Sequence, residues 1–168
     1  GGVIYTRRTY NAKGQLVKEQ TDAGNAATTM APTLWEYDDF GNKVKETWKL
    51  ADPATVSNSR ITAWSYGTEQ SEDGVYQVVT ATRNNGRGTT CDETQKTLVS
   101  SLSSTLESKT VFIGPRGNIS TQWSEYGTGA LRTQKSSIPT SNVIATATVI
   151  DGFTASQTDH AGVTATHT

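Results

Sequence analysis

Two adjacent acidic residues, Asp38 and Asp39, are the first candidates for chemistry in this sequence. Acid–base catalysis by two carboxylates requires both groups to converge on one substrate. Neighbouring residues in a strand or turn point to opposite sides, and the D-x-[DN]-x-[DN]-G spacing of a calcium loop is absent. Because Gly41 follows Asp38 three positions later, we interpret Asp38 as the residue that caps a hairpin turn.

The only histidines, His160 and His167, and the only cysteine, Cys91, show no zinc-site spacing. The sequence contains no G-x-S-x-G nucleophile elbow, although a Ser–His–Asp arrangement could still form in space. We expect His160 to be an exposed imidazole in a turn and Cys91 to be an unreactive thiol. The sequence therefore predicts a protein that is not an enzyme, with no catalytic residue, metal site or cofactor.

Four tryptophans, Trp35, Trp48, Trp64 and Trp123, have two interpretations. Aromatic rings on a sheet fill a thin core and form cross-strand pairs. The same rings could instead form a platform on which sugars stack. Trp64 and Trp123 lie in related stretches, WSYGT and WSEYGT, which favours packing; carbohydrate binding is the alternative.

Composition excludes several classes of function. With 15 Lys and Arg against 16 Asp and Glu, the net charge is −1, whereas nucleic-acid and anionic-membrane surfaces need clustered positive charge. No apolar run approaches the roughly 20 residues of a membrane span. Hydrophobic residues make up only 33% of the chain, so we expect a thin, sheet-like core.

The sequence repeats itself. YNAKGQLVKE (10–19) aligns without gaps with YDDFGNKVKE (37–46), and IGPRGNIST (113–121) is a weaker third copy. QTDAGN (20–25) is similar to QTDHAGV (157–163). Repeat-like units therefore lie near 5–25, 36–49, 111–127 and 149–168, within a single repeat-containing segment.

Each copy predicts a hairpin. An Asp or Asn with a glycine three positions later is typical of a type I turn followed by a residue at positive φ. The expected turn formers are Gly14, Asp38, Gly41, Gly117, Gly152 and Gly162, and the expected packing aromatics are Tyr10, Tyr37, Trp64 and Trp123. Turn signals about every ten residues indicate an all-β chain of antiparallel hairpins. Segment 92–109 fits a helix or a strand, and its Ser and Thr content favours strand.

The stretch Tyr37-Asp38-Asp39-Phe40-Gly41-Asn42 resembles the Y-D-x-x-G-[R/N] motif of the Rhs/YD-repeat family, and 151–168 resembles the linking half of such a repeat. The sequence departs from the family at Gln15, Asn42 and Asn118, where arginine is common. The family's D-P-x-G autoproteolysis signature is also not matched, since Asp52-Pro53 is followed by Ala54-Thr55.

The resemblance implies a curved, repeat-built sheet that forms part of a shell. Such shells enclose or present another polypeptide region, for example a toxin domain, and belong to secreted or cell-surface proteins. The implied partners are neighbouring repeats of a longer chain and an enclosed protein. Exposed strand edges also predict self-association.

Overall fold

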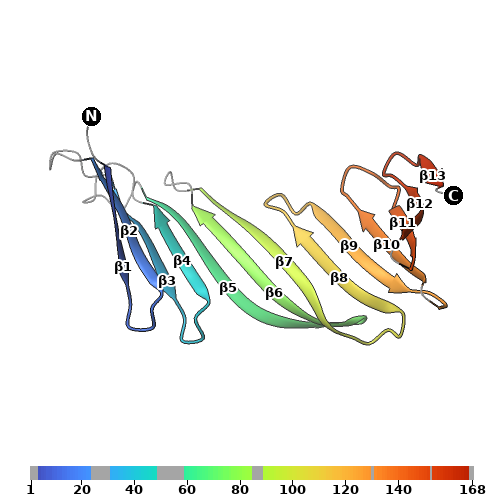
Figure 1. Ribbon diagram of the computed structural model, residues 1–168, viewed down its shortest axis with the longest axis horizontal. Helices are drawn as coiled ribbons and strands as arrows, with labels where there is room; N and C mark the ends of the chain where they lie inside the picture. The colour runs from blue at the N-terminus through green and yellow to red at the C-terminus, as the bar shows by residue number, and fades with distance from the viewer. Residues whose placement is uncertain are drawn as a thin grey trace. The chain divides into compact units, whose positions relative to one another are not determined.

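The computed structural model describes residues 4–23, 31–48, 59–84, 89–129, 131–151 and 153–166. Among these residues every regular element is a β-strand (Figure 1). The strands are β1 (Ile4–Tyr10), β2 (Leu16–Ala23), β3 (Thr33–Tyr37), β4 (Lys43–Trp48), β5 (Arg60–Ser71), β6 (Gly74–Asn84), β7 (Thr90–Ser101), β8 (Leu106–Ile113), β9 (Ile119–Tyr126), β10 (Leu131–Ser137), β11 (Ala145–Ile150), β12 (Phe153–Thr158) and β13 (Thr164–Thr166).

The strands are hydrogen-bonded in chain order, from β1 to β13, as a 13-stranded sheet. The strand pairs for which a register is defined are all antiparallel, as short hairpin connections require. The sequence-based prediction of an all-β chain built from antiparallel hairpins is therefore confirmed.

The chain divides into two compact units, and strands β5 to β7 contribute to both. The first unit comprises 1–65 and 81–92, and the second comprises 66–80 and 93–168. Among its described strands, the first unit contains the hairpins β1–β2 and β3–β4. The second contains strands β8 to β13 in full.

Segment 92–109 contains most of β7, a bend and the start of β8, so the strand interpretation is confirmed. A bend at 102–105 separates the two strands. It forms because Ser101 Oγ accepts a hydrogen bond from the backbone N–H of Ser103, at 3.1 Å, while the N–H of Leu102 donates to the carbonyl of Asp73, at 2.9 Å. These contacts draw Leu102, which is 66% exposed, out of the β7 ladder.

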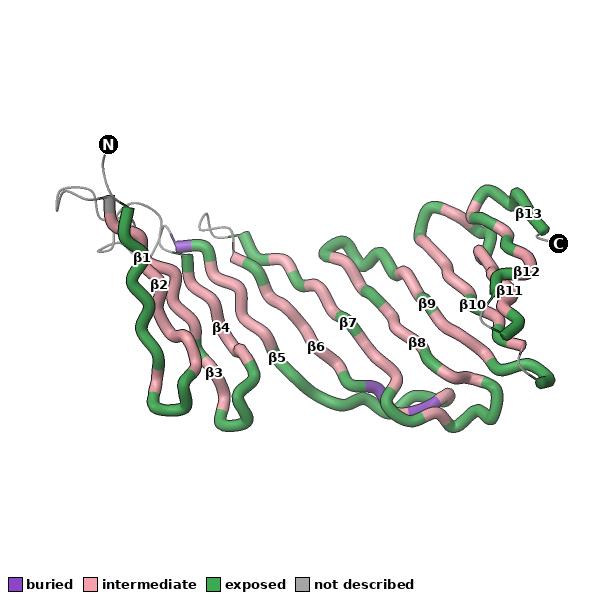
Figure 2. Tube along the Cα trace, viewed as in Figure 1, coloured by how far each residue is buried: buried purple, intermediate pink, exposed green. Residues whose placement is uncertain are grey.

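The described residues contain very little core. Figure 2 shows that most strand residues are intermediate or exposed. Tyr76 is the only described large hydrophobic residue that is buried, with 3% exposure, and Ser59 is the buried polar residue. Sheet faces with this little burial agree with the thin core that the composition predicts. Within the described residues, no helix has the length and hydrophobicity that crossing a membrane requires.

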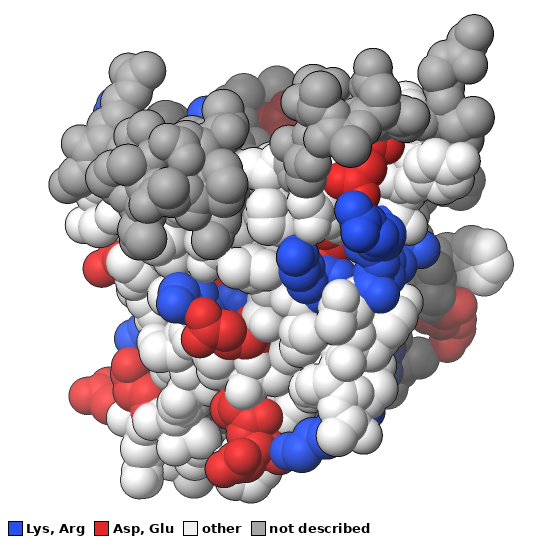
Figure 3. Space-filling view, turned by 90° about the vertical axis from the view of Figure 1, so that its left-hand side faces the viewer, with Lys and Arg blue, Asp and Glu red and all other residues white. Residues whose placement is uncertain are grey.

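Charges of both signs are intermixed on the face that Figure 3 shows. On the β1–β2 hairpin, Arg7 pairs with Asp22, and Arg8 Nε donates to Glu19 at 2.7 Å. Opposite charges on neighbouring strands stabilise the pairing modestly when they are exposed. This pattern is typical of a solvated sheet surface.

Candidate functional site

Four hairpins turn in the same way, at 11–14, 38–41, 114–117 and 159–162. In each turn, the backbone N–H of the first residue donates to the carbonyl of the residue that follows the glycine, at 2.8–3.0 Å. The N–H of the glycine donates to the carbonyl of the first residue, at 2.9–3.1 Å. The glycines are in the left-handed region, with φ between 75° and 92°. They are Gly14, Gly41, Gly117 and Gly162. Gly152 lies outside the described residues.

In three of these turns the side chain at the first position, Asn11, Asp38 or Asp159, caps the turn, as the Asx chemistry predicts, whereas the turn at 114–117 begins with a glycine and has no such cap. Asn11 Oδ1 accepts from the N–H of Lys13 and of Gln15 at 3.0 and 2.9 Å. Asp38 Oδ1 accepts from the N–H of Asn42 at 2.8 Å. The pKa of Asp38 is lowered, chiefly because the Asn42 side chain hydrogen-bonds to its carboxylate. The acid of the opening motif is thus an ionised turn cap.

The first two repeats touch each other at their turns. The hydroxyl of Tyr37 donates to the carbonyl of Leu16 at 3.0 Å. Lys13 Nζ reaches the carbonyl of Asp39 at 3.1 Å, and Gln15 Nε2 reaches that of Gly41 at 3.4 Å. Gln15 therefore makes its inter-turn contact through a side-chain amide.

Tyr10 is the equivalent of Tyr37 in the first repeat, and each pairs with the residue two positions after its glycine, Leu16 or Lys43. Tyr10 is 56% exposed, however, although we expected it to pack. The reason is positional, because β1 is paired with β2 alone among the described strands.

Tryptophan, glutamate and lysine side chains form a similar cluster in each unit. In the first unit, Trp48 Nε1 donates to Glu46 Oε1 at 2.6 Å, and Lys43 Nζ donates to Glu46 Oε2 at 3.3 Å. Lys43 also stands 5.8 Å and 5.6 Å from the ring centroids of Trp35 and Trp64, within cation–π range. Burial opposes ionisation of Glu46, but hydrogen bonds from the two indoles and the lysine outweigh it and lower its pKa.

The matching cluster of the second unit contains Trp123, Glu125 and Lys135. Trp123 Nε1 donates to Glu125 Oε1 at 3.0 Å, and Lys135 Nζ donates to Oε2 at 2.7 Å. The lysine hydrogen bond is the main cause of a lowered pKa for Glu125. Trp64 and Trp123 are therefore half-buried members of cross-strand networks, and Glu125 is ionised near neutral pH rather than poised as a general acid.

A third cluster lies under the β5–β6 turn, where Asp73 Oδ2 accepts from Lys109 Nζ at 2.5 Å and from the hydroxyl of Tyr76 at 2.9 Å. Lys109 lowers the pKa of Asp73, while burial and Asp73 raise that of Tyr76. Beside this cluster is a cavity of about 350 Å³, whose lining includes Asp73, Lys109, Trp123 and Glu125. The groups form a satisfied network that anchors the hairpin tip.

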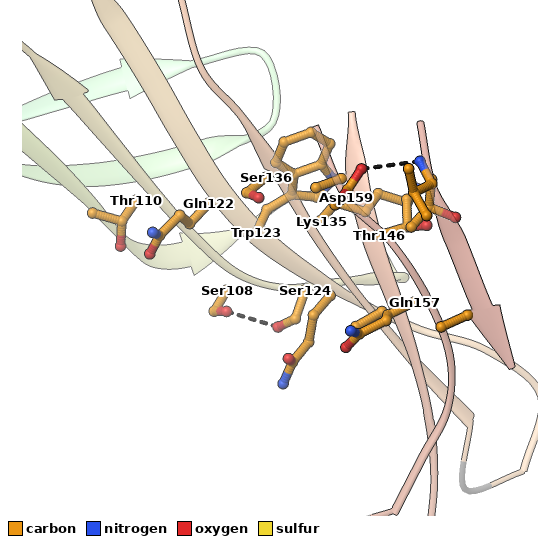
Figure 4. Close-up of a pocket in the computed structure, with 16 residues that line it drawn as sticks. Ser108, Thr110, Gln122, Trp123, Ser124, Lys135, Ser136, Thr146, Gln157 and Asp159 are labelled. Carbon is orange, nitrogen blue, oxygen red and sulfur yellow. Dashed lines mark hydrogen bonds between the residues drawn. The ribbon is translucent and has the colours of Figure 1, made fainter. Parts of the chain in front are cut away.

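A larger hollow, here called the β8–β13 groove, has a volume of about 650 Å³ (Figure 4). Paired residues of antiparallel strands point to the same face, so the register places hydroxyl and amide side chains in rows across it. One row contains Thr110, Gln122 and Ser136; the other contains Ser108, Ser124, Gln134 and Gln157. Ser108 Oγ and Ser124 Oγ are 2.7 Å apart.

His160 differs from its expected state. It is half-buried, not exposed, and both ring nitrogens have partners: Nε2 lies 3.2 Å from Ser136 Oγ, and Nδ1 lies 3.0 Å from the carbonyl oxygen of Val143. Sequence reasoning missed this pairing because Ser136 carries no local motif and lies 24 positions away. His167 lies outside the described residues. No group of three or more metal-binding side chains occurs in the part of the chain that the structure describes.

Comparison with known proteins identifies no relatives: no family model, no curated protein and no solved structure matches this chain.

Proposed function

We propose that this chain is a structural segment of a repeat-built β-sheet wall, which encloses or presents another polypeptide region in a secreted or cell-surface protein. The observation that carries the proposal is the set of contacts between the first two turns, above all the hydrogen bond from Tyr37 to the carbonyl of Leu16. Side chains that link one hairpin to the next are what a repeat array needs, since single hairpins bury too little surface to be stable alone.

Two further features support the same proposal. Tyr10 is 56% exposed and holds on β1 the repeat position from which Tyr37 of β3 reaches the preceding hairpin. A repeat hairpin paired with β1 would offer Tyr10 the same kind of backbone carbonyl that Leu16 offers Tyr37. In addition, large apolar side chains such as Ile4, Phe40 and Phe153 are 69%, 93% and 80% exposed, which suits surfaces that neighbouring polypeptide covers.

The two equivalent tyrosines provide a matched pair of variants. Tyr37→Phe removes the inter-repeat hydrogen bond and should lower the free energy of unfolding by about 0.5–1.5 kcal/mol. Tyr10→Phe removes an exposed hydroxyl in the same repeat position and should change the stability by less than about 0.5 kcal/mol. Urea denaturation measures both. Equal effects of the two substitutions would show that the Tyr37 contact does not join the repeats.

Carbohydrate binding is a second candidate function, favoured by the cavity of about 350 Å³ beside Trp123. An indole with hydroxyl and carboxylate groups around it is a common setting for sugar recognition. Trp64 is a weaker candidate because Lys43 stands over its ring. Binding on a glycan array that Trp123→Ala abolishes and Trp64→Ala preserves would establish this function; no binding by the folded protein would exclude it.

A further inference from the structure

The side chains of Ser136 and His160 are arranged as a nucleophile and its base. Ser136 is near the end of β10, and His160 lies in the β12–β13 turn, with 3.2 Å between Oγ and Nε2. The carbonyl oxygen of Val143, 3.0 Å from Nδ1, can only accept a hydrogen bond, so Nδ1 of the neutral ring carries the proton. Nε2 is then the basic nitrogen, and it accepts the hydroxyl hydrogen of Ser136.

Several contacts hold the imidazole in this orientation. The hydroxyl of Ser141 donates to the backbone carbonyl of His160 at 2.7 Å, which ties the turn to the β10–β11 loop. Asp159 caps the turn from the other side, accepting from the N–H groups of Ala161 and Val163 at 2.8 and 2.9 Å. The carbonyl of Val143 thus occupies the orienting place that a carboxylate occupies in a Ser–His–Asp triad.

Ser136 also has room for a substrate, because it lines the β8–β13 groove. Figure 4 shows Ser136 together with the neighbouring side chains of the groove. The register places Ser136 opposite Gln122 on β9 and opposite Ala145 on β11. A small residue on one side leaves space beside Oγ, and an amide on the other side supplies an N–H donor that could stabilise an oxyanion.

We propose that Ser136 and His160 form a hydrolytic dyad that cleaves an ester of a small acyl group with a neutral, hydroxyl-rich alcohol. The alcohol class follows from the groove, whose rows of Ser, Thr and Gln side chains offer donors and acceptors without net charge. A scaffold role and this activity are compatible, since the dyad uses side chains of one face and one turn.

The reaction balances with water as the only co-substrate. Ser136 Oγ forms a bond to the acyl carbon while its proton moves to His160 Nε2, and the carbonyl electron pair becomes an oxyanion. Collapse of the oxyanion breaks the ester C–O bond, and Nε2 returns the proton to the departing alcohol. Water then attacks the acyl-Ser136 carbon in the same way, releasing the acid and restoring both side chains.

Labelling of the wild-type protein is the decisive measurement, because the same contacts could merely fix the turn. A fluorophosphonate probe followed by peptide mass mapping should place one phosphonyl group on Ser136 in preference to every other hydroxyl of the chain. The protein should also hydrolyse p-nitrophenyl acetate above the rate of buffer alone. Absence of the adduct, or an adduct spread over many serines, would overturn the proposal.

Variants then assign the roles. Ser136→Ala and His160→Gln should each reduce kcat/KM for p-nitrophenyl acetate by at least about 100-fold, the usual contribution of a nucleophile and its general base. His167→Gln, which removes the only other histidine, and Cys91→Ser should leave it unchanged. Circular dichroism checks that each variant is folded. A folded Ser136→Ala or His160→Gln protein that hydrolyses the ester at the wild-type rate would also refute the dyad. If either variant unfolds, the presence or absence of the fluorophosphonate adduct on Ser136 of the wild-type protein tests the proposal.

Discussion

The substitution Gly74→Ala tests how the β5–β6 turn is held in the second unit. A Cβ atom added at Gly74 would overlap the carbonyl oxygen of Ser100 and stand 2.7 Å from Leu98 Cδ1 and 3.1 Å from Ser101 Cα. Two of these three neighbours are backbone atoms of β7, which cannot rotate away as the end of a side chain can. The turn must therefore move away from β7.

The size of the effect can be worked from the contacts that this movement breaks. Forcing one extra carbon into a tight site costs about 1–3 kcal/mol. Losing the hydrogen bond from Leu102 to Asp73, 2.9 Å long, adds about 0.5–1.5 kcal/mol. We expect a total loss of roughly 2–4 kcal/mol in the free energy of unfolding, which for a chain of this size corresponds to a Tm lower by roughly 4–16 °C.

Urea denaturation followed by tryptophan fluorescence and circular dichroism measures this loss. Gly67→Ala is the matched control, because a Cβ at Gly67 would meet no atom within 4 Å, and it should stay within about 0.5 kcal/mol of the wild type. If a folded Gly74→Ala protein were as stable as the control, the turn would not pack against β7 in the way described, and the buried position of Tyr76 would need another explanation.

The remaining predictions concern a turn, a carboxylate and a strand edge. Gly41→Val should destabilise the protein by more than roughly 1 kcal/mol, because valine is strained at φ 92°, and unchanged thermal melting would contradict the turn assignment. The lowered pKa of Asp73 stabilises the protein fully above the ordinary value of 3.8, and this contribution is lost as the pH falls from 3.8 through the folded-state value. The difference between the urea midpoints of wild type and Asp73→Asn should therefore stay constant above 3.8 and shrink below it, and a difference that does not shrink on acidification below 3.8 would exclude Asp73 as the cause. The β1 edge, with Tyr5 59% exposed, should self-associate at high concentration, and Tyr5→Lys should weaken this in sedimentation experiments; a strictly monomeric wild type would refute edge pairing.

The fold was predictable where a local stretch of sequence determines the local structure by itself. An Asn or Asp followed three positions later by glycine specifies both the side-chain cap and the positive φ, so the β-hairpin architecture can be inferred from 11–14 and 38–41 alone. The bend that separates β7 from β8 could not be inferred in this way. The bend depends on the backbone carbonyl of Asp73, which accepts a hydrogen bond from the N–H of Leu102. Asp73 belongs to the β5–β6 turn, which is distant from Leu102 in the sequence.

The candidate sites were less predictable because they join distant residues. Asp73 and Lys109 are separated by 36 positions, and Ser136 and His160 by 24, without any spacing that marks them as partners. The exposure of Tyr10 could not be predicted either, because the repeat alignment places Tyr10 and Tyr37 at equivalent positions. Packing of a repeat residue depends on which hairpin precedes it, and that is a property of the array, not of the motif.

The pairing of strands in chain order has a consequence for how the molecule is made. Each strand pairs with the strand just before it in the chain, so the sheet can grow from the N-terminus while the polypeptide is being synthesised. It also means that duplicating or deleting one hairpin in the gene adds or removes a rung without rerouting the chain. The number of strands in such a sheet can therefore change in evolution without a change in the topology of the remaining strands.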